Sequence, residues 1–260
     1  METTMSSSLP PEILDLILDH LYDEPTTLRA CCLVSKSWVP RTRRHFFDRV
    51  DFHPPIILLE SWMKTFPDPF KSPAHYTRSL NFCHLRFPDD TAFLDACPWV
   101  RSFNQIVNLE VTTFQWRFPF PQLCGLSPAL KSLTLTLPVA TLSEFLDLIC
   151  SFPLLEDLSM LSPRFHAEGT DELDTPPTSP KFTGSLFLSD GDSNLMRGLM
   201  LLPGGLHFSK VSVSYDFENC DWVKELVSAC SNTLESLCVE YEGALSTASA
   251  VDQYLIDTCR

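Results

Sequence analysis

The chain has 260 residues, enough for one or two domains, and 44% of them are apolar, which excludes disorder throughout its length. Its formal net charge is −14. Residues 1–50 hold six basic and seven acidic side chains, whereas residues 51–260 hold 13 basic and 26 acidic ones. Because phosphate binding requires clustered Lys and Arg, this balance argues against a nucleic-acid partner. It is compatible with a basic partner or with simple solubility.

The ten cysteines include no C-x-x-C pair, and the chain has no N-x-Ser/Thr sequon. The polar start at residues 1–8 does not resemble a signal peptide, and the apolar runs are too short to span a bilayer. These features favour reduced thiols and a cytoplasmic or nuclear location.

The first predicted element is a helix that begins at Pro10 and Pro11, because proline is tolerated in a first helical turn. Ile13, Ile17 and Leu21 then recur every four residues, which places them on one face. The helix is expected to end before the next proline.

A second helix is predicted from about Leu28 to near Phe46, with Thr26 or Thr27 as its N-cap. Pro40 is expected to bend or interrupt this helix, because proline lacks the N–H donor. Apolar residues lie on several faces of both predicted helices. Two short helices cannot bury that much apolar surface against each other, so the pattern predicts a partner.

One pattern near the N-terminus consists of Leu9-Pro10-Pro11-Glu12-Ile13-Leu14, of Leu28, and of Leu33-Val34-Ser35-Lys36-Ser37-Trp38. This pattern resembles the F-box, and is similar to that of the F-box proteins abundant in mushroom-forming fungi. It implies a helical domain over residues 1–46 that binds a Skp-type adaptor and, through it, a cullin. The contacts it implies are Leu9, Pro10, Ile13, Ile17, Leu21, Leu28, Cys32, Leu33, Val34, Ser35 and Trp38.

The function that the resemblance implies is non-catalytic: recruitment of a target protein to a Skp–cullin–F-box ubiquitin ligase. One alternative is an interaction protein that binds the Skp adaptor outside any ligase. A simpler alternative is that the apolar residues only hold the two helices together.

From residue 47 onward, an apolar-x-x-apolar-x-apolar triplet recurs. Full copies are Phe47/Val50/Phe52, Ile106/Leu109/Val111, Leu130/Leu133/Leu135, Leu155/Leu158/Met160, Phe208/Val211/Val213 and Leu234/Leu237/Val239. Looser copies that begin with threonine are Thr77/Leu80/Phe82 and Thr183/Leu186/Leu188. Successive middle residues are 30, 29, 24, 25, 28, 25 and 26 positions apart, at or just above the period of leucine-rich repeats.

The predicted fold class is therefore α/β: a helical F-box followed, over residues 47–260, by a leucine-rich-repeat-like solenoid with a parallel sheet on its concave face. Helices are predicted between the strands, at 142–149 and through Trp222, Leu226, Val227 and Cys230, with weaker patterns at 56–66 and 91–97.

Residues that alternate with the triplets should face outward on the sheet and form a surface that recognises a target protein. The candidates are Asn81, Glu110, Thr134, Thr136, Ser159, Ser212, Ser214 and Glu240. The same small, hydroxyl-rich face could also serve solubility alone.

The segment 166–181 is acidic and rich in proline, and it is interpreted as a poorly ordered loop inserted between two units. Thr175 and Ser179 each precede proline and could be phosphorylated. Residues 251–256 could form a short capping helix; alternatively, the array of repeats is cut short.

Catalytic and metal-binding motifs are weak. Gly191-Asp192-Ser193 is similar to the nucleophile block of GDSL-type hydrolases, but His207 is the only histidine after it, and a turn is the simpler interpretation. Cys83 and His84 are adjacent, and the later cysteines lack the paired spacing of structural zinc sites. We therefore expect no cofactor and no metal.

Overall fold

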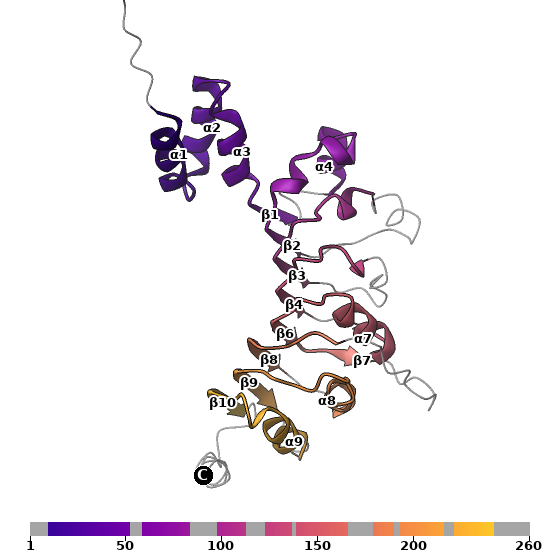
Figure 1. Ribbon diagram of the computed structural model, residues 1–260. Coiled ribbons are helices and arrows are strands. Elements are labelled where there is room, and N and C mark those ends of the chain that lie inside the picture. Colours follow the sequence, from indigo (N-terminus) through magenta and orange to yellow (C-terminus); the bar gives the residue numbers. More distant parts are fainter. Residues whose placement is uncertain are drawn as a thin grey trace, which may run out of the picture.

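The computed structural model describes residues 10–52, 59–83, 98–112, 123–136, 139–165, 179–189, 193–215 and 221–241. Three short helices come first in the chain. An eight-stranded parallel sheet follows, with helices packed along one of its faces (Figure 1). The fold class is thus α/β with a helical N-terminal region, as predicted.

The N-terminal helices are α1 (Pro11–His20), α2 (Pro25–Val34) and α3 (Val39–Phe46). The prediction of one helix from Leu28 to Phe46 was wrong, because Ser35 adopts an extended conformation and ends α2. Pro40 lies in the first turn of α3, where its missing N–H has no partner to lose.

The predicted N-cap of the second helix was also wrong. Helix α2 begins at Pro25, so Thr26 and Thr27 lie inside its first turn, and Glu24 is the N-cap residue. The Glu24 side chain makes no capping hydrogen bond. Proline at the first helical position starts the helix instead, because its φ angle is already fixed near the helical value.

The middle and third residues of each of the eight predicted triplets lie in a strand of the large sheet. The strands are β1 (Arg49–Phe52), β2 (Ser79–Cys83), β3 (Asn108–Thr112), β4 (Ser132–Thr136), β6 (Asp157–Leu161), β8 (Ser185–Ser189), β9 (Lys210–Tyr215) and β10 (Ser236–Tyr241). They lie side by side in chain order, and every neighbouring pair is parallel.

The register of the sheet follows the triplets. The middle residues pair in one continuous row: Val50, Leu80, Leu109, Leu133, Leu158, Leu186, Val211 and Leu237. The third residues form a second row two positions further along. Because a slip by one residue would turn every apolar side chain to the opposite face, burial of these rows specifies the pairing.

A repeated backbone contact sets the start of each strand. The carbonyl oxygen of Arg78 accepts the N–H groups of Val107 and Asn108 at 2.7 and 3.0 Å. The carbonyl of Lys131 does the same for the N–H groups of residues 156 and 157, at 2.8 and 2.9 Å. Equivalent pairs join Asp48 to residues 78 and 79, and Ser209 to residues 235 and 236. One unit thereby positions the next.

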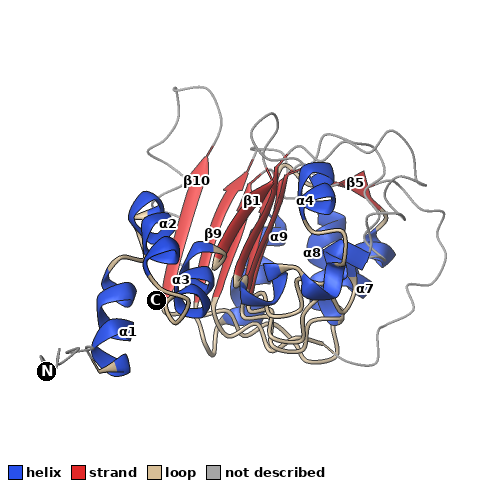
Figure 2. Cartoon of the chain, turned by 90° about the horizontal axis from the view of Figure 1, so that it is seen from above, coloured by secondary structure: helices blue, strands red, loops and turns tan. Residues whose placement is uncertain are grey.

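Four helices cover one face of the sheet: α4 (Leu59–Thr65), α7 (Leu142–Cys150), α8 (Ser193–Met200) and α9 (Asp221–Cys230) (Figures 1 and 2). Short 3-10 helices lie at Pro69–Lys71 (η1) and Pro73–Tyr76 (η2), and β5 (Val139–Ala140) pairs with β7 (Arg164–Phe165) in a separate small sheet.

The helices predicted through 142–149 and 222–230 are confirmed, and α7 begins with a capping box between Thr141 and Glu144. Within the stretch 56–66, the structure has α4 at Leu59–Thr65. Helix α8 was not predicted, because the polar residues at its start were interpreted as a turn.

The core is continuous from β1 to β10, with the triplets packed against the helices. Its N-terminal part is aromatic. The rings of Phe52 and Phe82 stack at 5.4 Å, and Trp62 and Phe103 contact Phe52 and each other. One triplet differs from the prediction. Thr183 is exposed, and the buried first position is taken by Phe182, whose backbone has a φ of 43°.

That exception lies where β8 joins β6. Here the Asp157 carboxylate replaces a backbone acceptor: its Oδ1 accepts both the N–H and the hydroxyl of Ser185, each at 2.6 Å. The carboxylate approaches so closely that a Cβ on Gly184 would lie 2.4 Å from Asp157 Oδ1. A larger residue at position 184 would therefore displace the Asp157 carboxylate.

Several predicted features fall on residues that the structure does not describe: the helix at 91–97, most of the acidic loop, including Thr175, and the capping helix at 251–256. No helix among the described residues is long and apolar enough to cross a membrane.

We expect Gly184→Ala to lower the free energy of unfolding by about 1–3 kcal/mol, because the new methyl group forces the Asp157 carboxylate away from Ser185. Urea denaturation measures the change, with Ser132→Ala on β4 as the control. An unchanged midpoint for Gly184→Ala would show that Asp157 moves aside at no cost.

Candidate functional site

The three N-terminal helices expose more large apolar side chains than they bury. We define the helical patch as the exposed large apolar residues of this region: Ile13, Leu16, Ile17, Tyr22, Leu33 and Val34. Leu33 is 88% exposed and Val34 is 65% exposed. Monomeric proteins seldom leave such side chains in one short segment in water, so the patch is a candidate interaction surface.

Helix α1 is apolar on two opposite sides. Its inner side buries Leu18. Ile13, Leu16 and Ile17 are spaced so that they share the outer side, and all three are exposed. A helix that only packed against α3 would need one apolar stripe. The outer stripe therefore has no role in holding the helices together.

The structure separates the predicted adaptor contacts into three groups. Pro10, Ile13, Ile17, Leu33 and Val34 are exposed, whereas Leu21, Cys32, Ser35 and Trp38 are half-buried. Leu28 is only 1% exposed, so it belongs to the interior of the region and is not available to a partner. Leu9 lies outside the described residues.

Sequence reasoning missed Leu16 and Tyr22, which are 56% and 62% exposed. The signal for Leu16 was present, because it lies three residues after Ile13 and therefore on the same face. Tyr22 lies just beyond the end of α1, where helical periodicity no longer indicates which way a side chain points.

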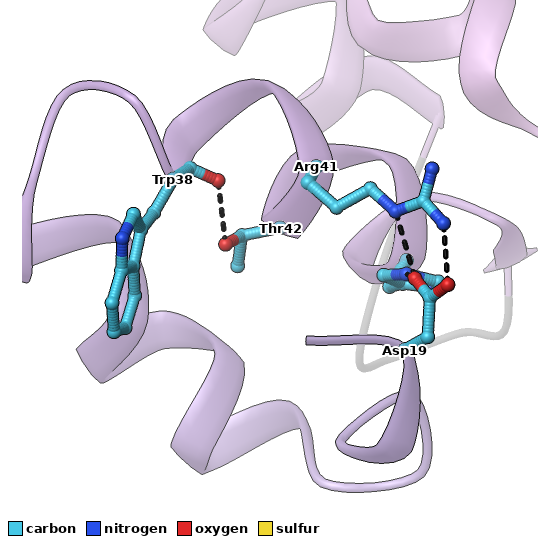
Figure 3. A network of polar contacts seen from close by, with 5 residues as sticks. Asp19, Trp38, Arg41 and Thr42 are labelled. Carbon is cyan, nitrogen blue, oxygen red and sulfur yellow. Dashed lines mark hydrogen bonds and ion pairs between the residues drawn. The ribbon is translucent and has the colours of Figure 1, made fainter. Parts of the chain in front are cut away.

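The turn between α2 and α3 holds Trp38 in place. Its backbone N–H donates to the carbonyl of Ser35 at 3.1 Å. Its backbone carbonyl accepts from the Thr42 hydroxyl at 2.8 Å (Figure 3). The hydroxyls of Ser35 and Ser37 lie 2.9 Å apart. These short-range bonds order the loop that follows Leu33 and Val34.

An ion-pair network fixes α1 against α3. The Arg41 side chain donates to both carboxylate oxygens of Asp19, with Nε 2.7 Å from Oδ1 (Figure 3). The His45 Nε2 also lies 2.7 Å from Asp19 Oδ1. The hydrogen bonds from Arg41 lower the pKa of Asp19 from its ordinary value of 3.8 to about 2, and His45 adds to the shift.

The helices join the sheet through aromatic rings. Phe46 and Phe47 meet edge to face at 5.0 Å, and Phe47 packs on Trp62 at 5.9 Å and on Phe66 at 6.3 Å. The guanidinium of Arg29 lies 5.2 Å from the centre of the Phe46 ring. The end of α3 is therefore anchored beside β1 and α4.

The sheet face opposite the four helices is the second candidate surface. Its outward side chains form three rows that run across the strands. The first row is Arg49, Ser79, Asn108, Ser132, Asp157, Ser185, Lys210 and Ser236; the second is Asp51, Asn81, Glu110, Thr134, Ser159, Phe187, Ser212 and Cys238; the third is Cys83, Thr112, Thr136, Leu161, Ser189, Ser214 and Glu240.

The eight predicted outward residues all belong to the second and third rows. Asn81 donates from Nδ2 to Glu110 Oε2 at 3.1 Å. Ser214 is buried and is not available to a target. The prediction missed Phe187, which is 37% exposed. It lies between Leu186 and Leu188 in the sequence, and the alternation there was used only to place the two leucines in the core.

The residues considered for catalysis lie in separate elements. The Nε2 of His207 lies 2.9 Å from the Gly204 carbonyl oxygen of its own loop, and Ser193 is the first residue of α8. Among the described residues, no group of three His, Cys, Asp or Glu side chains could hold a metal ion. Burial raises the pKa of the Cys150 thiol to about 11, and burial followed by the Glu110 and Asp51 charges raises the pKa of Cys83. Neither thiol is an activated nucleophile.

The Asp19 network gives a pH-dependent contribution to stability. Because folding lowers the Asp19 pKa, the stabilisation is complete above a pH of 3.8, the ordinary pKa, and is lost as the pH falls toward about 2. We expect Asp19→Asn to melt at a lower temperature than the wild type at pH 7, and the difference to shrink over that acidic range. The effect is modest because the Asp19 side chain is 37% exposed. A difference that stays constant with pH would show that the ion pair contributes nothing.

Comparison with known proteins identifies the N-terminal region. The family model described as F-box-like matches residues 6–47, which include the helical patch and the Asp19 network. No curated protein matches the chain significantly. Residues 6–47 therefore carry an F-box-like domain.

Proposed function

We propose that this chain is the substrate-recognition subunit of a Skp–cullin–F-box ubiquitin ligase. In this role the F-box-like domain binds a Skp-type adaptor, and the sheet holds a target protein. The observation that carries the proposal is the helical patch, which remains uncovered by the described residues and lies within the F-box-like match. The chain performs no covalent step: it raises the concentration of the target near an enzyme that is held elsewhere in the complex.

The remainder of the chain is proposed to be a leucine-rich-repeat-like solenoid. Each unit supplies one strand and a returning segment, and the carbonyl contacts between successive units repeat along the chain. Such arrays use an exposed sheet for recognition. We place the complex in the cytoplasm or nucleus, where its thiols stay reduced.

We expect Leu33→Ala to weaken binding to a Skp-type adaptor by about tenfold or more, because a fully exposed leucine becomes buried in the complex. Isothermal titration calorimetry measures the change. Leu154→Ala is the matched control, since Leu154 is 50% exposed in the turn after α7, outside the F-box-like domain.

Leu28→Ala distinguishes a residue that stabilises the fold from one that contacts the adaptor. It should lower the free energy of unfolding by about 2–4 kcal/mol, whereas Leu33→Ala should leave that energy nearly unchanged. Failure of the folded wild type to bind the adaptor would overturn the proposal.

The alternative, in which the chain binds the adaptor outside any ligase, differs in ubiquitin transfer. With adaptor, cullin and a ubiquitin-loaded enzyme present, we expect the lysines of the chain itself, such as the exposed Lys210, to be modified. Transfer should be lost with Leu33→Asp and kept with Leu154→Asp. Tight adaptor binding without any transfer would favour the alternative.

A further inference from the structure

The charges on the open face of the sheet are sorted by row. Its two cations, Arg49 and Lys210, both lie in the first row. The carboxylates of Asp51, Glu110 and Glu240 lie in the second and third rows. The fourth acid, Asp157, is in the first row, where its Oδ1 accepts two hydrogen bonds from Ser185.

Two of these carboxylates are open to a ligand. Glu110 and Glu240 are both exposed, and within the described part of the chain neither has an ion-pair partner. Asp51, in contrast, is paired with Arg49 at 3.1 Å. The Asn81 amide donates to Glu110 Oε2 and holds that side chain over the sheet. The open negative charge is thus concentrated at β3 and β10.

Phe187 lies between them. Its neighbours in the second row are Ser159 on β6 and Ser212 on β9, and Ser185 and Ser189 flank it along β8. A phenyl ring that is 37% exposed among small hydroxyl side chains lacks apolar cover on its sides. The small neighbours leave room for another backbone to lie directly on the sheet beside the ring.

The order of the strands sets the spacing of these three groups. Glu110 on β3 lies in the same row as Phe187 on β8 and is three strands from it, or about 14 Å. Glu240 on β10 is two strands from Phe187 and one row further along, because it aligns with Ser189, so this separation is about 12 Å. An extended peptide advances about 3.3 Å per residue, and its successive side chains point to opposite faces. Both distances therefore correspond to about four residues, an even number that keeps all three side chains on the face toward the sheet.

We propose that the open face binds an extended basic segment of the target protein that crosses the strands. Its pattern is a basic residue, three residues, an apolar residue, three residues and a second basic residue. The basic residues pair with Glu110 and Glu240, and the apolar side chain packs on Phe187. The inference rests on the proposed function, since it specifies which targets the adaptor subunit selects.

A fluorescein-labelled peptide, Gly-Lys-Ser-Thr-Ser-Leu-Ser-Thr-Ser-Arg-Gly, tests the pattern by fluorescence anisotropy with the full chain. A second peptide of the same composition, with Lys, Leu and Arg placed next to one another, controls for general attraction to an acidic protein. We expect the patterned peptide to bind about tenfold more tightly than the rearranged one. Equal affinities, or no saturable binding at millimolar concentration, would overturn the inference.

Variants assign the contacts. Phe187→Ser, Glu110→Gln and Glu240→Gln should each weaken binding of the patterned peptide by about fivefold or more, whereas Glu225→Gln on the outer side of α9 should not. The Glu110→Lys variant should bind a peptide whose Lys is replaced by Glu more tightly than the wild-type protein binds that peptide. Unchanged affinity in Phe187→Ser, with an unchanged melting temperature, would also overturn the inference.

Adaptor binding by the same protein preparation is measured in parallel. If the adaptor binds and the patterned peptide does not, this inference fails while the proposed function stands. If neither binds, the proposed function fails as well.

Discussion

The structure depends on one constraint: a single unit of this chain cannot bury its own apolar triplet. Each strand carries its core residues on one face, and a strand of four to six residues with one short helix leaves those residues partly open to water. Burial requires the neighbouring units on both sides. The bifurcated carbonyl contact between units then places each new strand in register, so that Leu109 lies beside Leu80 and Leu133.

The constraint also explains why the two candidate surfaces differ in chemistry. The sheet buries most of its apolar residues against the helices, so its open face carries mainly hydroxyls, with a few charges, amides and thiols. Leu161 and the aromatic Phe187 are its two large apolar side chains among the described strand residues. The F-box-like domain is too small to bury everything it carries. Leu18 and Leu28 fill its interior, whereas the side chains of the helical patch, Leu33 above all, remain exposed.

Polar contacts position both surfaces without forming either of them. Asp19 bridges Arg41 and His45 and thereby fixes the outer stripe of α1 relative to α3. Asp157 holds Ser185 at the one junction where the regular backbone contact is interrupted. In each case a carboxylate accepts several hydrogen bonds, which makes the local geometry specific.

The sequence by itself determined the large parallel sheet. The eight triplets located its eight strands and their register, because the alternation of apolar residues has a period of two and the spacing between copies is nearly constant. The motif at Leu9-Pro10 and Trp38 likewise identified the F-box-like domain, which the family comparison supports. Local patterns were sufficient wherever one face of an element had to be buried.

Only the tertiary structure decided which apolar residues are free. Leu28 and Leu33 are both leucines of α2, yet one is 1% exposed and the other 88%, because the packing of α3 covers one side of the helix. The break at Ser35 and the replacement of Thr183 by Phe182 in the core also depend on contacts between distant segments. The same is true of the spacing of Glu110, Phe187 and Glu240 across the sheet. Hydrophobicity states that a side chain favours burial, but only the fold determines whether its own chain supplies the cover.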